Sequence, residues 1–128
     1  MNNKKILIVD DEEAVRSLFS EALKLRGYEV HTAANGEEAL KVLEEVKCRV
    51  MLLDLNLPGM DGIELCKEIR KNHPIAIIFA ITGYASMYHL VDCREARFDN
   101  FFIKPVSIQT LMEEVSHAFR QIDRWVAK

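Results

Sequence analysis

The stretch over residues 50–62 constrains the fold of this chain more than any other. Four large apolar residues run directly into Asp54, and after three further residues a Pro58-Gly59 turn begins. A run this short and this apolar, bounded by turn signals, is typical of a strand buried on both faces. The pattern therefore places Asp54 at the carboxyl end of a central strand, which is where ligands bind in open α/β sheets.

The remaining chain alternates between strand patterns and helix patterns. Strands are predicted at about residues 5–10, 28–33, 49–54, 75–82 and 101–103. A stretch with apolar residues at helical spacing follows each strand, with start signals at Asn35, Asp61 and Ser107 and a stop at Gly27. Strict alternation of this kind predicts a parallel sheet covered by helices on both faces, but it does not fix the order of the strands.

The size and charge of the chain exclude several broad classes. Its 128 residues, without a linker or a repeat, fit a single domain over residues 1–128. A net charge of −3 gives no electrostatic reason to expect nucleic acid binding, and the four apolar residues before Asp10 are too few for a signal peptide or a membrane span. Cys48, Cys66 and Cys93 match neither a disulfide framework nor a zinc site. We therefore expect a cytoplasmic protein with reduced thiols.

Polar residues of a particular kind follow four of the five predicted strands. The first strand ends in Asp10 and Asp11, the third in Asp54, the fourth in Thr82 and the fifth in Lys104. Taken singly, such residues are more often helix caps, turns or solvated loops. Because the carboxyl ends of parallel strands lie at one edge of a sheet, three carboxylates, a hydroxyl and an ammonium should converge there. Their joint placement indicates a functional site.

The chemistry of that group of side chains is constrained by its charge. Three crowded carboxylates raise one another's pKa unless cations offset them. Lys104 supplies one positive charge, and a hard divalent cation such as Mg²⁺ would supply two more while leaving positions open for phosphate oxygens. A carboxylate beside Mg²⁺, an ammonium and a hydroxyl can attack phosphorus. The residues alone therefore predict metal-dependent phosphoryl chemistry at Asp54.

The sequence resembles the receiver domain of bacterial two-component response regulators over essentially its whole length. The motifs that carry the resemblance span residues 6–11, 52–62, 80–83 and 102–105, and each is weak alone but the set is highly specific. The resemblance implies a flavodoxin-like (βα)₅ fold, with a five-stranded parallel sheet in the order 2-1-3-4-5. It also implies a signalling module that catalyses only its own phosphotransfer and slow autodephosphorylation.

The resemblance further implies roles for individual residues. Asp54 would accept a phosphoryl group from a phosphohistidine on a sensor histidine kinase or a phosphotransfer protein. Mg²⁺ (or Mn²⁺) would be held by Asp10, Asp11, Asp54 and the backbone carbonyl of Asn56. Lys104 would pair with the phosphoryl oxygens.

The resemblance also implies a switch that involves the fourth and fifth predicted strands. Thr82 would hydrogen-bond the new phosphate, and Phe101 stands where the family has its aromatic switch. Because Phe101 lacks a hydroxyl, we expect its ring to lie inward even without phosphate. The Lys104-Pro105 bond would be cis. The face formed by the fourth helix, fifth strand and fifth helix would then control an effector protein or a fused output domain, and it is also a candidate for homodimer contacts.

The sequence departs from the family's usual pattern at the loop after the fourth predicted helix and at the site. Arg97 stands where a small residue is usual, and Phe98 is unusually large, so we expect the contacts of that loop to differ. Tyr84, two residues past Thr82, is bulky and is expected to shield the acyl phosphate from water, which would slow its loss.

Three other functions fit the sequence less well. A haloacid-dehalogenase-type phosphatase needs a second acid two positions after its nucleophile, where this chain has Asn56. A flavin-binding flavodoxin needs a loop rich in Thr, Ser or Gly after the first strand, where this chain has four acidic residues, 10–13. A phosphorylation-independent scaffold on the same fold is disfavoured only by the presence of every site residue.

Overall fold

The structure is a computed structural model that describes residues 4–83 and 90–126. Its strands are β1 (Lys5–Val9), β2 (Glu29–Ala33), β3 (Val50–Asp54), β4 (Ile77–Thr82) and β5 (Asn100–Ile103). Its helices are α1 (Glu13–Leu25), α2 (Gly36–Glu45), α3 (Gly62–Asn72), α4 (Leu90–Glu95) and α5 (Ile108–Val126). Strands and helices alternate as the hydrophobic pattern predicts.

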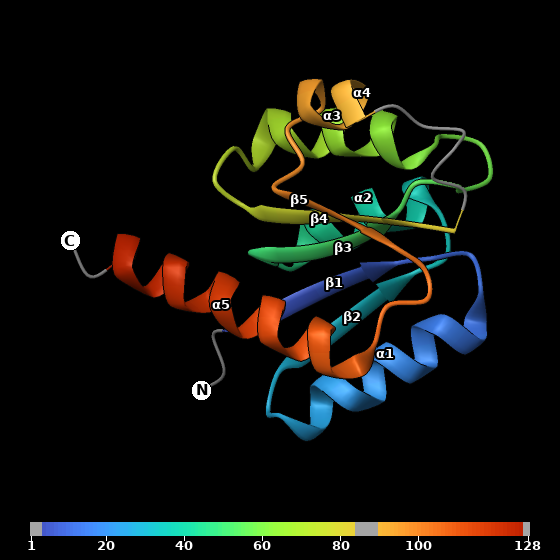
Figure 1. The fold of residues 1–128 in the computed structure, drawn as a ribbon. Helices are drawn as coiled ribbons and strands as arrows, with labels where there is room; N and C mark the ends of the chain where they lie inside the picture. Colours follow the sequence, from blue (N-terminus) through green and yellow to red (C-terminus); the bar gives the residue numbers. More distant parts are fainter. Residues whose placement is uncertain (1–3, 84–89, 127–128) are drawn as a thin grey trace.

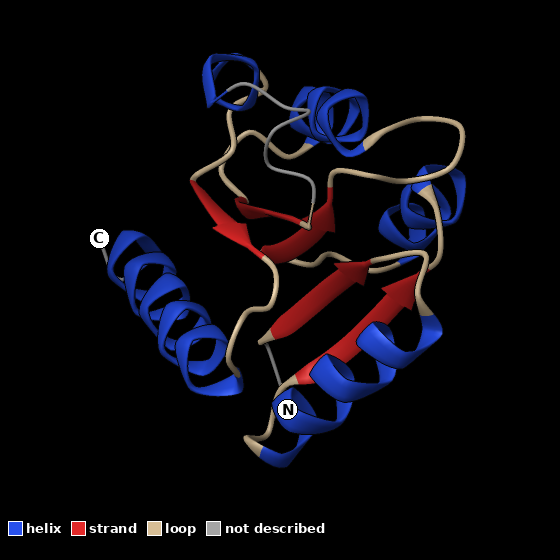
Figure 2. Cartoon of the chain, turned by 45° about the vertical axis from the view of Figure 1, so that its right-hand side comes forward, coloured by secondary structure: helices blue, strands red, loops and turns tan. Residues whose placement is uncertain are grey.

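The strands form one parallel sheet in the order β2-β1-β3-β4-β5. Helices α1 and α5 cover one face of this sheet, whereas α2, α3 and α4 cover the other (Figures 1 and 2). The flavodoxin-like fold and its strand order, which the resemblance implied, are therefore confirmed.

The central position of β3 follows from its composition. All five of its residues are buried, because they lie between β1 and β4 in the sheet and between helices on both faces. Successive side chains point to opposite faces, so Leu52 packs with Ile8 and α5 in one core, whereas Leu53 packs with Val9 and α3 in the other. A strand with no solvent-facing side has to be largely apolar, as the first four residues of β3 are.

Local side-chain hydrogen bonds start three of the helices where the sequence predicts. The carboxamide oxygen of Asn35 accepts from the Glu38 N–H at 2.9 Å, and the carboxylate of Asp61 accepts from the Glu64 N–H at 2.9 Å. The Ser107 hydroxyl oxygen accepts from the N–H three residues later at 3.0 Å. These bonds satisfy amides that the helix cannot pair internally.

The predicted bounds differ from the observed ones by one or two residues. The largest difference is at β4, which begins at Ile77 instead of residue 75. The preceding residues form a turn, in which the Ala76 N–H donates to the His73 carbonyl and Ile75 is 63% exposed. The helix predicted after the fourth strand is described only from Leu90, because residues 84–89 lie outside the described part.

The three cysteines, Cys48, Cys66 and Cys93, are free and buried, as expected. Burial raises the pKa of Cys48 and of Cys66 to about 11, so both remain thiols at neutral pH. Among the described residues, no helix has the length and the apolar character that crossing a membrane requires.

Candidate functional site

The predicted polar residues do meet at the carboxyl edge of the sheet, where the strand arrows of Figure 1 end. Asp54 is the last residue of β3 and Thr82 the last residue of β4, while Asp10 and Lys104 directly follow β1 and β5. The sheet register brings the strand ends level, because Asp54 pairs with Ile81 in the parallel ladder.

One ammonium group joins the first, third and fifth strands. Lys104 Nζ donates to Asp10 Oδ2 at 2.9 Å and to Asp54 Oδ2 at 3.3 Å. Both carboxylate side chains are only 5% exposed, and the lysine side chain is 20% exposed. A cation therefore lies between two buried anions, which would otherwise repel each other.

The pKa values of this group reflect burial and its neighbours. Burial raises the pKa of Asp54 and the charge of Asp10 raises it further, while the Asn56 N–H, donating to Asp54 Oδ1 at 3.0 Å, and Lys104 act in the opposite direction. Burial alone would lower the pKa of Lys104, but its contacts with Asp10 and Asp54 raise it overall. Lys104 thus remains a cation, and Asp54 is a carboxylate of increased basicity.

Acidic oxygens suited to a metal ion gather beside this group. Carboxylate oxygens of Asp10, Asp11 and Glu12 lie within 4.8 Å of one another. Oxygen donors of this kind, partly open to solvent, fit a hard cation such as Mg²⁺. Asp10 and Asp11 are therefore brought together as the sequence predicts, and Asn56 lies two residues past Asp54, tied to it through its N–H.

Two residues near the site were not predicted from the sequence. Glu12 Oε1 lies 3.6 Å from Lys104 Nζ, and the Glu12 N–H donates to Asp10 Oδ1 at 2.9 Å. Arg16, on α1, donates through Nη1 to the Asp10 carbonyl oxygen at 2.7 Å, which fixes the turn after β1. The only sequence signal for Glu12 is its place directly after the two aspartates. Arg16 has the pattern of an ordinary exposed polar residue in a helix.

The remaining predicted residues have distinct surroundings. Thr82 is fully buried, and its carbonyl oxygen accepts from the Lys104 N–H at 2.8 Å. Phe101 is partly buried and packs against Leu55, Ala80 and Cys93, in agreement with the inward position expected for its ring. The Lys104-Pro105 bond is cis, as the resemblance implied.

Tyr84, expected to shield the acyl phosphate, lies outside the described residues, so that expectation stays a prediction.

Comparison with known families and curated proteins gives a consistent result. The family model of the response regulator receiver domain matches residues 6–116. The alkaline phosphatase synthesis transcriptional regulatory protein PhoP of Bacillus subtilis is 39% identical over 119 residues, which cover 93% of this chain and 50% of PhoP. The chain spans about half or less of the length of the first curated relatives that it matches.

Solved structures are similar over nearly the whole chain. The CheY-like response regulator receiver domain protein from Methanospirillum hungatei superimposes with a TM-score of 0.90 at 34% identity, covering 94% of this chain and 97% of that one. The response regulator TrrA from Thermotoga maritima, solved in complex with Mg(2+)-BeF, has a TM-score of 0.80 at 37% identity. That likeness covers 90% of this chain and 98% of TrrA.

Proposed function

Because this chain belongs to the response regulator receiver domain family, we propose that it is a phospho-accepting signalling switch whose acceptor is Asp54. The observation that carries the proposal is the contact of the Lys104 ammonium with two buried carboxylates, 2.9 Å from Asp10 and 3.3 Å from Asp54. A nucleophilic carboxylate, a fixed cation and acidic oxygens for a metal are the parts that phosphoryl transfer requires.

The phosphoryl donor is a phosphohistidine on a sensor histidine kinase or a phosphotransfer protein. A carboxylate oxygen of Asp54 attacks phosphorus, the bond from phosphorus to the histidine nitrogen breaks, and its electron pair remains on the imidazole. Lys104 then pairs with the phosphoryl oxygens, since its ammonium already lies beside the attacking group. Asp10, Asp11, Asp54 and the Asn56 carbonyl would hold Mg²⁺ or Mn²⁺, which when bound offsets the charge on those oxygens.

The output of the switch is the face formed by α4, β5 and α5. The hydroxyl of Thr82 donates to the new phosphoryl group, and the ring of Phe101 is held in the space behind it. The same face carries two exposed aliphatic side chains, Val91 at 62% and Ile103 at 59% exposure. Apolar residues in such positions suit contact with a downstream effector, an output domain or a second copy of the chain.

The proposal is tested by incubating the protein with acetyl phosphate and Mg²⁺ and measuring its intact mass. We expect a single phosphoryl adduct that is absent from the Asp54→Ala variant. Asp123→Ala is the matched control, because Asp123 is an exposed carboxylate on α5 outside the site, and it should keep the adduct.

The alternatives give different outcomes in the same experiment. Continuous release of phosphate without a lasting adduct would indicate a phosphatase. No adduct in the wild-type protein would indicate a scaffold that works without phosphorylation. An adduct that persists in Asp54→Ala would place the acceptor elsewhere.

A further inference from the structure

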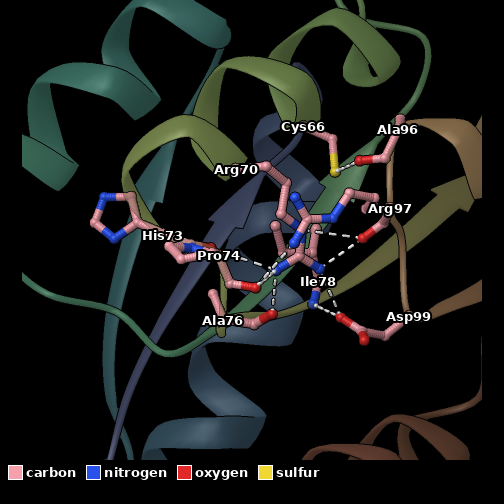
Figure 3. Close-up of polar contacts among 9 residues, drawn as sticks. All are labelled: Cys66, Arg70, His73, Pro74, Ala76, Ile78, Ala96, Arg97 and Asp99. Carbon is pink, nitrogen blue, oxygen red and sulfur yellow. Dashed lines mark hydrogen bonds and ion pairs between the residues drawn. The ribbon is translucent and has the colours of Figure 1, made fainter.

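A buried arginine connects three segments at the amino edge of the sheet, opposite the edge that carries Asp54. Arg70 belongs to the last turns of α3, and its side chain is only 6% exposed. Its guanidinium points into the space between the start of β4 and the turn that joins α4 to β5 (Figure 3). A buried charge of this kind is tolerated only when hydrogen bonds surround it.

The guanidinium uses all three of its nitrogen atoms. Nε and Nη2 both donate to the Arg97 carbonyl oxygen, at 3.0 and 2.6 Å, and Nη2 also donates to Asp99 Oδ2 at 2.9 Å. Nη1 donates to three carbonyl oxygens between α3 and β4, those of His73 at 3.4 Å, Pro74 at 3.2 Å and Ala76 at 2.5 Å. The side chain of Arg70 therefore links α3, to which it belongs, with the start of β4 and with the turn after α4.

Asp99 extends these contacts into the sheet. Its Oδ2 accepts from the Ile78 N–H at 2.8 Å, and its own N–H donates to the Ile78 carbonyl at 2.8 Å. The ion pair with Arg70 is thus attached to β4 by both the backbone and the side chain of Asp99.

The carboxyl end of α4 is held at the same place. Arg97 has a φ of 71°, a left-handed conformation that costs a non-glycine residue about 1 kcal/mol. Its N–H donates to the Arg94 carbonyl, and the Phe98 N–H donates to that of Cys93, which together close the helix end. From α3, Cys66 Sγ donates to the Ala96 carbonyl at 3.1 Å, beside the carbonyl that Arg70 binds.

We propose that Arg70 and Asp99 form an anchor that fixes the carboxyl end of α4 to α3 and β4, and so confines the response to phosphorylation to the opposite edge of the sheet. The inference rests on the proposed function, because it concerns where phosphorylation changes the fold. Moving the end of α4 would break several hydrogen bonds to a buried charge, and such bonds are expensive to leave unmade. The anchored end therefore stays in place while residues near Asp54 rearrange.

A purely structural arginine would give a different result from an anchor. Loss of a structural arginine would lower stability everywhere and leave the pattern of the phosphorylation response unchanged. Loss of an anchor would let that response spread to the amino edge. The pattern of the response, and not stability, is therefore the quantity to measure.

The test is amide hydrogen exchange of the full chain with and without Mg²⁺ and beryllofluoride, which stands in for the phosphoryl group. In the wild-type protein we expect beryllofluoride to change the exchange rates of the Asn56 and Lys104 amides by about tenfold. The exchange rates of the Phe98 and Asp99 amides should change by less than about twofold. Arg70→Lys keeps the charge but cannot bind both Arg97 and Ala76. In this variant, beryllofluoride should change the exchange rates of the Phe98 and Asp99 amides by about threefold or more.

Two further variants keep the test decisive. Asp99→Asn removes the charge that pairs with Arg70. It should give the same beryllofluoride-dependent change in exchange at Phe98 and residue 99, and it serves as the test if Arg70→Lys is too unstable to study. Arg120→Lys is the matched control, because Arg120 lies exposed on α5 and donates to the Ser116 hydroxyl at 3.4 Å, one turn away on the same helix, so the exchange pattern of this variant should equal the wild-type pattern.

Each failure has its own meaning. A wild-type response at Phe98 and Asp99 as large as that at Asn56 would overturn the anchor alone. The anchor would also be overturned if those two amides exchange faster in Arg70→Lys but remain indifferent to beryllofluoride. No response at Asn56 and Lys104 in the wild-type protein would overturn the proposed function, and the anchor with it.

Discussion

Asp54 combines deep burial with a proposed role, that of phosphoacceptor, which requires its negative charge. Burial and the charge of Asp10 raise its pKa, and the Asn56 N–H and Lys104 only partly offset them. The folded protein therefore binds a proton at Asp54 more tightly than the unfolded chain does. Stability associated with this group is present at low pH and is lost as pH rises through the raised pKa of the folded state.

Asp54→Asn should consequently be more stable than the wild-type protein at neutral pH. Asparagine keeps an oxygen that accepts from the Asn56 N–H but carries no charge, so we expect a gain on the order of 1 kcal/mol at pH 7 without divalent ions. The gain should disappear below the ordinary carboxyl pKa of 3.8, where Asp54 is protonated in both states. Urea unfolding across this pH range measures the difference.

The matched control for that prediction is Asp123→Asn, which neutralises an exposed carboxylate on α5. It should change the free energy of unfolding by less than about 0.5 kcal/mol at any pH. If Asp54→Asn were less stable than the wild-type protein at pH 7, the view that burial of this charge is unfavourable would be wrong.

At the scale of elements, the site depends on how closely α3 approaches the end of β3. The Gly62 N–H donates to the Leu55 carbonyl at 3.0 Å, which folds the connecting loop back onto the strand. A Cβ at Gly62 would collide with the Asp54 carbonyl oxygen and lie 2.7 Å from the Leu55 Cα. Backbone atoms cannot move aside as the end of a flexible side chain can, so glycine is required there.

Gly62→Ala should therefore push α3 away from β3 and disturb the loop that carries Asn56. We expect a loss of about 2 kcal/mol or more in the free energy of unfolding, measured in urea. Gly83→Ala is the control, because its Cβ would lie 3.9 Å from the Lys104 side chain, an ordinary contact, and should cost less than about 0.5 kcal/mol. Equal losses of unfolding free energy in the two variants would contradict the close approach of α3 to the end of β3.

Elements whose determinants are local could be predicted from the sequence, and those that depend on distant partners could not. The caps at Asn35 and Asp61 act within one turn of their own helix, so the sequence locates them directly. The pattern of apolar runs gave the strands, but their order came from resemblance. The anchor at Arg70 was not foreseen, since its partner Asp99 lies 29 residues away and a polar residue in a helix is usually exposed.

The candidate site was predictable for a different reason. In a parallel sheet every strand end falls at the same edge, so the residues that end β1, β3, β4 and β5 are brought together by topology alone. The contact of Glu12 with Lys104 depends instead on where two side chains extend beyond that edge. No pattern within the chain encodes that geometry.

At the scale of the whole molecule, the two cores stabilise the sheet from both faces, while the carboxyl edge concentrates negative charge. A divalent ion that binds this edge in the folded state and not in the unfolded chain must raise the stability of the entire domain. At Mg²⁺ concentrations 100 times the dissociation constant, the gain should be about 2.7 kcal/mol, and it should continue to rise with concentration. Thermal unfolding against a Mg²⁺ series, at constant ionic strength, measures it.

Asp11→Asn separates specific binding from general screening of charge. Asp11 is exposed, so its replacement should leave the fold intact while removing one of the gathered carboxylates. We expect the Mg²⁺-dependent rise in Tm to shrink by more than about half in this variant, because a hard cation depends on carboxylate ligands. Since salt alone screens the repulsion among exposed carboxylates, an equal rise in both proteins, or an equal rise with NaCl, would mean that no magnesium site exists at this edge.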